Sequence, residues 1–181
     1  MKICTLLFIL LLAGCATVEP VKKVSIATGV DMQLLLPTEN ISLTQKITAR
    51  YKNDEHLLIM QVQASPQKIV MAGLAPTGTR LFSLSFDGKT VENWKSPLFI
   101  APFDGSYVLA DFELATLNIA ALRGALPTNV LLTEITHSPT AHERNVSNAQ
   151  GKIVIRIEYL GAQTRYCHLE RDYCLQIEAL P

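Results

Sequence analysis

From Ile41 to the end of the chain, apolar and polar residues alternate in short runs, and this alternation constrains the fold more than any other feature. In the run 42–51 every even position is polar, whereas most odd positions are apolar. The same period of two returns clearly in the run 153–159. Successive side chains of a β-strand point to opposite faces, so this period predicts strands with one buried face and one solvated face.

Residues with turn propensity separate these runs, and Asp87-Gly88 is the strongest hairpin signal among them. Five consecutive strands at spacings of about 8–12 residues indicate a meander, which resumes over residues 130–180. The strands do not alternate with helices, which argues against a parallel α/β sheet. The other turn signals are Asn53-Asp54, Ser65-Pro66, Pro76-Thr77-Gly78 and Gly161.

Between the two sets of strands, residues 106–126 have helical spacing of their apolar residues. Asn118 is a natural N-cap for a second short helix, which Gly124 and Pro127 end. A twisted antiparallel sheet of about nine to eleven strands tends to curl and enclose an interior. We therefore expect a mainly β protein with a helical lid (α+β), built as an unclosed antiparallel β-barrel. The pattern leaves open whether the helices cover the barrel or pack outside it, and whether the interior is hollow or filled.

The N-terminus carries an apolar run, Ile3–Leu12, too short to span a bilayer. The following Ala13-Gly14-Cys15 resembles the bacterial lipobox, in which the cysteine is acylated and the preceding residues are removed. We expect residues 1–14 to be a signal peptide and Cys15 to be lipidated. Residues 15–36 are expected to form a tether with a first short segment, and residues 37–181 the barrel domain. The alternative is an ordinary secreted protein with a cysteine near its cleavage site. Since Ala16 rather than aspartate follows Cys15, the resemblance implies the periplasmic face of the outer membrane.

Composition and motifs argue against several other classes. The chain has 16 basic and 16 acidic residues and a net charge of zero, which does not suit a protein that binds nucleic acid by neutralising phosphates. It contains no Gly-x-Ser-x-Gly, phosphate-binding loop or His-Glu-x-x-His motif. Asp104, Asp111 and Glu113 form a local carboxylate cluster, for which helix capping or a surface position is a simpler role than catalysis. We expect no enzymatic activity, no catalytic residue and no cofactor.

Several segments resemble a family of uncharacterised proteobacterial lipoproteins that are often encoded beside aryl polyene biosynthesis genes. They are Gly73–Leu84, Leu109–Leu114 and Ala121–Leu126. More distantly, Pro76-Thr77-Gly78 and Leu117–Pro127 are similar to segments of LolB, the outer-membrane receptor for lipoproteins. The resemblance implies a LolB-like open barrel that receives acyl chains, with a periplasmic carrier protein as a possible partner. LolB exposes a leucine where this chain has Thr77, so we do not expect the same delivery of lipoproteins.

On this basis we expect the inward-facing apolar side chains to bind a hydrophobic acyl or polyene lipid without converting it. The alternative is a tethered assembly partner of envelope enzymes whose interior is filled. A hydrolase or thiol oxidoreductase is a third class. The expected cavity residues are Leu58, Met60, Val62, Ile69, Met71, Phe82, Leu84, Phe86, Ile153, Ile155 and Ile157, and the expected lid residues are Val108, Leu109, Phe112 and Leu122.

After loss of the signal peptide and lipidation of Cys15, the remaining cysteines are Cys167 and Cys174. A hairpin that turns at Glu170-Arg171 places them directly opposite each other, and an oxidising compartment then favours a disulfide. A redox site is the alternative, but the spacing is not Cys-x-x-Cys. The histidines (His56, His137, His142 and His168) lack metal-ligand spacing, so we expect no metal site.

Overall fold

The computed structural model describes residues 22–100 and 103–181, so the expected signal peptide and Cys15 lie outside the described residues. Within these ranges ten strands form one antiparallel sheet in the order β7-β6-β5-β4-β3-β12-β11-β10-β9-β8. The two meanders are joined where β3 pairs with β12. The strands are β3 (Ile41–Tyr51), β4 (Asp54–Ala64), β5 (Ile69–Leu74), β6 (Arg80–Phe86), β7 (Val91–Lys95), β8 (Leu131–Ser138), β9 (Ala141–Ser147), β10 (Ile153–Leu160), β11 (Gln163–His168) and β12 (Tyr173–Leu180).

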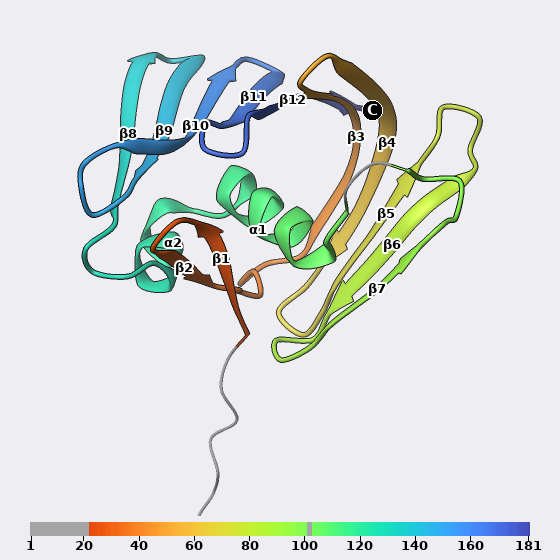
Figure 1. Cartoon of the computed structure of the whole chain (residues 1–181), viewed down its shortest axis with the longest axis horizontal. Helices are drawn as coiled ribbons and strands as arrows, with labels where there is room; N and C mark the ends of the chain where they lie inside the picture. The colour runs from red at the N-terminus through yellow and green to blue at the C-terminus, as the bar shows by residue number, and fades with distance from the viewer. Residues whose placement is uncertain (1–21, 101–102) are drawn as a thin grey trace, which may run out of the picture.

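The sheet bends around a central helix without closing on itself (Figure 1). Its outermost strands, β7 and β8, do not pair with each other, and they leave the two edges of the sheet separate. The bend follows from the right-handed twist that accumulates across many antiparallel strands. The predicted mainly β fold, an unclosed antiparallel barrel with helices, is therefore confirmed.

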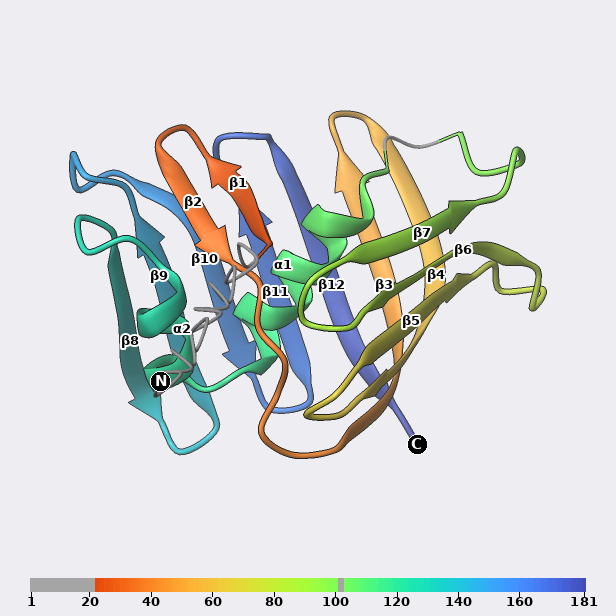
Figure 2. The same ribbon diagram turned by 90° about the horizontal axis from the view of Figure 1, so that it is seen from below.

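The helical segment forms α1 (Gly105–Thr116) and α2 (Ile119–Ala125). Asp104 caps α1 by accepting the Ser106 N–H at 2.8 Å, and Asn118 caps α2 by accepting the Ala121 N–H at 2.9 Å. These bonds satisfy donors that a helix start leaves unpaired. Of the two positions that the sequence left open, α1 takes the inner one and lies on the concave side of the sheet (Figure 2).

The N-terminal part of the described chain is folded, and the first short segment expected within residues 15–36 is a β-hairpin. β1 (Lys23–Ala27) and β2 (Val30–Gln33) form a separate antiparallel hairpin. Its inward side chains are buried in the same apolar cluster as those of α1, and this burial holds the hairpin on the domain. They are Val24, Ile26, Val30 and Met32, followed by Leu34.

The turn between β11 and β12 also fixes this hairpin through polar contacts. Arg171 Nη2 donates to the Ser25 carbonyl at 2.7 Å, and the Thr28 N–H donates to Glu170 at 3.0 Å. His168 Nδ1 accepts the Arg171 N–H at 3.2 Å, so its Nε2 carries the proton and donates to the Ile26 carbonyl at 2.6 Å. Burial lowers the pKa of His168, which keeps the ring neutral in this role.

The last hairpin has the predicted register. Cys167 lies opposite Cys174, and the two cysteines form a disulfide. Tyr173, Leu175 and Ile177 of β12 point to the concave side of the sheet, as the alternation indicates, because they line the space beside α1. No helix in the described part of the chain is long and apolar enough to cross a membrane.

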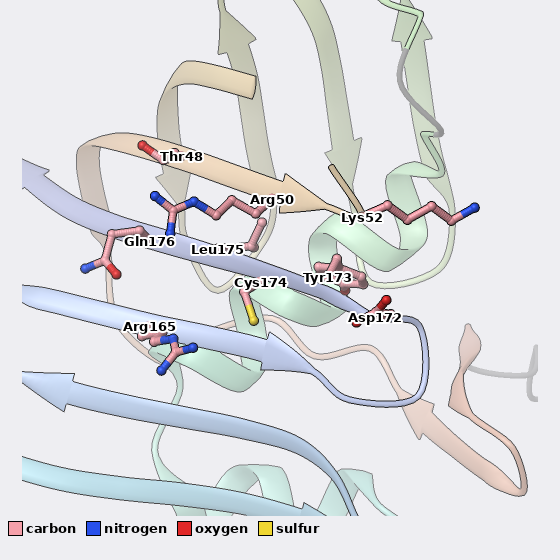
Figure 3. Close-up of a pocket in the computed structure, with 9 residues that line it drawn as sticks. All are labelled: Thr48, Arg50, Lys52, Arg165, Asp172, Tyr173, Cys174, Leu175 and Gln176. Atoms are coloured by element: carbon pink, nitrogen blue, oxygen red, sulfur yellow. The ribbon is translucent and has the colours of Figure 1, made fainter. Parts of the chain in front are cut away.

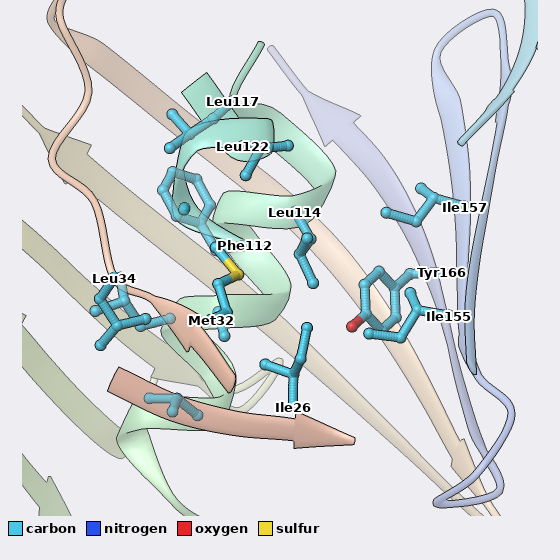
Figure 4. Packing of buried hydrophobic residues seen from close by; sticks show 14 of the residues in the cluster. Ile26, Met32, Leu34, Phe112, Leu114, Leu117, Leu122, Ile155, Ile157 and Tyr166 are labelled. Carbon is cyan, nitrogen blue, oxygen red and sulfur yellow. The ribbon is translucent and has the colours of Figure 1, made fainter. Parts of the chain in front are cut away.

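Helix α1 divides the interior of the bent sheet into two unlike halves. On one side, side chains of α1, α2, the N-terminal hairpin, β10 and β11 pack into a continuous apolar core (Figure 4). Leu114, Ile155, Ile157 and Tyr166 are among the fully buried members of this core. On the other side, facing β3–β6 and β12, part of the inward face is also packed, but a hollow remains between the rest of that face and α1.

Candidate functional site

This hollow is a cavity of about 940 Å³ between α1 and the concave face of the sheet. Ligand sites typically occupy roughly 300–1,000 Å³, so the space suits a small molecule or a lipid chain. Apolar side chains from five strands, α1 and the loop before α1 make up most of the wall. They are Ile47, Ala49, Leu58, Met60, Met71, Phe82, Phe99, Ile100, Phe103, Val108, Phe112, Ala115, Leu175 and Ile177.

Four of the expected cavity residues line the wall: Leu58, Met60, Met71 and Phe82. They occupy inward positions on β4, β5 and β6, where the alternation placed them. Four other expected residues on the same strands are buried in the apolar core and lie away from the cavity wall. They are Val62, Ile69, Leu84 and Phe86. The alternation thus finds the inward face, but only part of that face borders the hollow.

The expectation that Ile153, Ile155 and Ile157 of β10 line the cavity is wrong. Ile155 and Ile157 are fully buried in the packed half of the interior, on the far side of α1 from the cavity, and Ile153 is only half-buried. The pairing of β10 with β9 shifts register between Ile153 and Ile155, and Val154 is consequently buried together with Ile155. These side chains stabilise the fold and do not border the cavity.

The expected lid residues are divided in the same way. Val108 and Phe112 face the cavity from α1, so this helix forms one of its walls. Leu109, also on α1, and Leu122, on α2, are fully buried and lie away from the cavity. Since α1 is covered on both sides, it is an internal partition of the domain more than a lid across an opening.

The sequence did not assign the β3 and β12 wall to the cavity. Ile47, Leu175 and Ile177 line it because β12 pairs with β3, which brings the last strand beside the first strand of the meander. Alternation marks all three as inward-facing, but the pairing of strands so far apart in sequence has no local signal.

The loop between β7 and α1 supplies an aromatic group that the sequence also did not reveal. Phe99 and Phe103 surround the ring of Phe82, with centroids 5.5 and 4.5 Å away from it. These distances are typical of favourable aromatic pairs. The neighbouring Leu98 and Ile100 are 77% and 87% exposed, so the described part of this loop also presents apolar side chains to solvent.

A polar group interrupts the apolar wall in the middle of α1. Asp111 accepts one hydrogen bond from the Tyr166 hydroxyl and one from the Tyr173 hydroxyl, each at 2.5 Å. Burial raises the pKa of Asp111 to about 6, against the opposing effect of these two donors. Burial and the neighbouring carboxylate raise the pKa of both tyrosines, which therefore remain protonated and donate. The expectation of a surface or capping role is wrong for Asp111 and right for Asp104.

Arg171 lies beside this group and also lines the cavity. Its guanidinium stacks on the ring of Tyr107, with the central carbon 3.8 Å from the ring centroid. The positive charge of Arg171 acts on this carboxyl group, because it partly opposes the rise that burial causes in the pKa of Asp111. The cavity therefore has a polar side at the β11–β12 turn, composed of Asp111, Tyr107, Tyr173 and Arg171.

Glu113 is the second acid of α1; it is fully buried and lies outside the cavity. Its Oε2 accepts the Leu35 N–H at 2.9 Å, while its Oε1 has no hydrogen-bond partner among the described residues. Burial raises the pKa of Glu113 to about 9, so the side chain is neutral at physiological pH. This contact attaches the segment after β2 to α1 and corrects the expected surface position.

A second hollow, of about 200 Å³, lies on the opposite face of the sheet around the disulfide (Figure 3). Its wall is polar and charged, with Arg50, Lys52, Arg165 and Asp172 among the lining residues. At this size it is too small for a lipid chain. Within residues 22–100 and 103–181, no group of three or more His, Cys, Asp or Glu side chains is placed to hold a metal ion.

The comparison with curated proteins finds no match. Among solved structures, the LolA superfamily protein NE2245 from Nitrosomonas europaea is similar with a TM-score of 0.43 and 7% identity, over 82% of this chain and 87% of that chain. A similarity of this size carries no information about ligand or activity. The model of one protein family, described as "Protein of unknown function (DUF3261)", matches residues 42–181, and the chain therefore belongs to that family.

Proposed function

We propose that this protein binds a hydrophobic lipid chain, acyl or polyene, in the cavity beside α1 and acts as a non-enzymatic carrier or acceptor in lipid or lipoprotein traffic of the cell envelope. The observation that carries the proposal is the cavity of about 940 Å³ with its mainly apolar wall. Removing apolar surface from water contributes about 25 cal/mol per Å², which gives affinity without strong selectivity for one chain. A filled interior would have favoured a tethered scaffold without a ligand.

The place of action is part of the same proposal. Acylation of Cys15 attaches the domain to the periplasmic face of the outer membrane, where a periplasmic carrier protein hands over or collects the ligand. One acyl chain holds a protein only marginally, whereas two or more hold it firmly. The resemblance to lipoproteins encoded beside aryl polyene genes makes an aryl polyene lipid a specific candidate cargo.

The binding test uses the chain with Cys15→Ser, purified without detergent. Mass spectrometry of the native protein is expected to detect a copurifying lipid. The neutral dye N-phenyl-1-naphthylamine is expected to fluoresce in the cavity and to be displaced by palmitate. Neither lipid nor dye in the protein would contradict the carrier function and favour the scaffold.

The anchor is tested separately, because binding in the cavity does not depend on it. Wild-type protein is expected in the outer-membrane fraction of a density gradient, and the Cys15→Ser variant is expected to be absent from that fraction. Equal distribution of both proteins would contradict the lipidation of Cys15 without affecting the binding proposal.

A further inference from the structure

The two sides of the cavity differ in chemistry. Beside β6 the wall consists of the rings of Phe82, Phe99 and Phe103. Beside the β11–β12 turn it consists of the polar group around Asp111 and Arg171. A ligand that matches both sides is amphiphilic, with an apolar end and a polar end.

The distance between the two sides indicates an elongated ligand. In the sheet order, β6 and β12 are separated by β5, β4 and β3, which makes four inter-strand steps. At about 4.8 Å per step this is roughly 19 Å along the sheet. Met60 and Met71, on β4 and β5, line the wall between the two sides with flexible apolar side chains. The path suits one extended hydrocarbon chain lying across the strands.

The free hydrogen-bonding capacity at the polar side belongs to Arg171. A guanidinium has five N–H donors. Nη2 donates to the Ser25 carbonyl, and the other two nitrogens of Arg171 donate to no residue in the described ranges. The planar fork of an arginine is suited to carboxylate and phosphate oxygens.

Of the acids that line the cavity, Asp54 is exposed at the start of β4, whereas Asp104 and Asp111, at and in α1, are engaged within the protein and do not favour a cationic head there. Both carboxylate oxygens of Asp111 accept tyrosine hydroxyls. Asp104 caps α1 through the Ser106 N–H. Among the other groups that line the cavity, Arg50 is paired with Glu55, outside the cavity wall, at 2.7 Å. Beside Asp111, the unengaged donors of Arg171 therefore favour an anionic head.

We infer that the ligand is a single-chain amphiphile with an anionic oxygen head, carboxylate or phosphate, whose head binds Arg171 and whose tail ends at the phenylalanine group. The inference rests on the proposed function and adds the ligand's charge and direction. Asp111 fixes Tyr173 in the wall and, when ionised, opposes the anionic head.

The first experiment compares heads on one chain, with the Cys15→Ser protein and the neutral dye. Palmitate and hexadecyl phosphate, which separate the two head chemistries, are expected to have dissociation constants at least about tenfold lower than that of hexadecanol when they displace the dye. Equal displacement by all three would overturn the inference while leaving the proposed function intact. Displacement by none of them would overturn both.

The second experiment changes the two charged residues. Arg171→Gln is expected to lower the affinity for palmitate about tenfold and the affinity for hexadecanol less than twofold. Asp111→Asn is expected to raise the affinity for palmitate without changing that for hexadecanol. Arg165→Gln, which removes an arginine from the opposite face of the hairpin, is the matched control and leaves all affinities unchanged. Since Arg171 also holds the hairpin, the Asp111 variant tests the charge without removing that contact. Parallel losses for palmitate and hexadecanol, or weaker palmitate binding by Asp111→Asn, would contradict an anionic head at Arg171.

The orientation of the ligand in the cavity is tested with a fatty acid that carries a photoreactive diazirine on its last carbon. Crosslinks mapped by mass spectrometry are expected on Phe82, Phe99 or Phe103. Crosslinks on Tyr107 or Tyr173 would reverse the orientation and overturn this part of the inference.

Discussion

The ring of Phe82 lies across the α-carbon of Gly73, its directly paired residue on β5, and fills the space that any side chain at this position would need. A Cβ atom added to Gly73 would come closer to the ring than real Cβ atoms approach other groups. The glycine thus lets the ring lie flat against the sheet, and the cavity beside it stays open. Aromatic residues often cover glycine on a neighbouring strand in this way.

Gly73→Ala is therefore expected to lower the free energy of unfolding by about 1–3 kcal/mol, because the ring must leave its position. The displaced ring enters the cavity, so dye binding is expected to fall as well. Urea unfolding and dye titration measure the two effects. The matched control is Gly124→Ala in α2, where an added Cβ meets no atom within 4 Å. That variant should gain about 0.5–1 kcal/mol from helix propensity, and a loss comparable to that of Gly73→Ala would contradict the steric explanation.

Met60→Trp is expected to fill part of the cavity and to abolish dye and palmitate binding, while the protein remains folded. Met60 points into the hollow, and the larger ring has room there. The control is Leu57→Trp, on the same strand with an exposed side chain that does not line the cavity. Circular dichroism and dye titration of both variants check the prediction. Unchanged binding by the Met60 variant would show that the dye binds elsewhere.

Glu113→Gln is expected to change how stability depends on pH. The native pKa of Glu113 is raised from 4.5 to about 9, so the folded state retains a proton that the unfolded chain releases above pH 4.5. The wild-type protein therefore loses this contribution as pH rises from about 4.5 to 9, by at most about 1.4 kcal/mol per pH unit. Glutamine is always neutral and is expected to remove that loss.

Urea unfolding at pH 5, 7 and 8.5 measures this effect. The advantage of the Gln variant over wild type should grow with pH across this series. Glu113→Ala, which lacks an acceptor for the Leu35 N–H, should be less stable than the Gln variant at every pH. Parallel stability curves for wild type and Glu113→Gln would show that Glu113 is not protonated in the folded protein.

Replacing both Cys167 and Cys174 by alanine is expected to lower the free energy of unfolding by about 2–3 kcal/mol, because a disulfide that closes so short a loop removes only a modest chain entropy. Wild-type protein in dithiothreitol should show the same loss, and the variant should not respond to the reductant. Dye binding by the variant should remain, because the bond lies on the opposite face of the sheet. Loss of binding without loss of stability would favour a redox role instead.

Local patterns predicted the elements well and their assembly less well. The alternation and the Asp87-Gly88 turn gave the strands, and Asn118 capped the second helix as expected. The N-terminal hairpin also has a local signal, since its buried side chains alternate around Thr28-Gly29, and Gly29 has a φ of +71°. Its strands are only five and four residues long, and a period of two over so few residues is weak evidence.

The cavity wall was predicted in part for a physical reason. Alternation shows that Ile157 and Leu175 both face inward, but α1 places Ile157 in the packed core and Leu175 at the hollow. The position of α1 depends on contacts between segments far apart in the chain, such as Tyr166 with Asp111. The inward positions of Asp111 and Glu113 have the same origin, because both acids lie on a helix that the sheet encloses.

Helix α1, with its two unlike sides, has a consequence for how such chains diversify. The densely packed core behind the helix does not border the hollow, whereas the side chains in front of it set the size and chemistry of the hollow. A substitution in front therefore changes what fits there without touching the packing behind α1. The architecture can in this way change its cargo while the part of the core behind the helix stays the same.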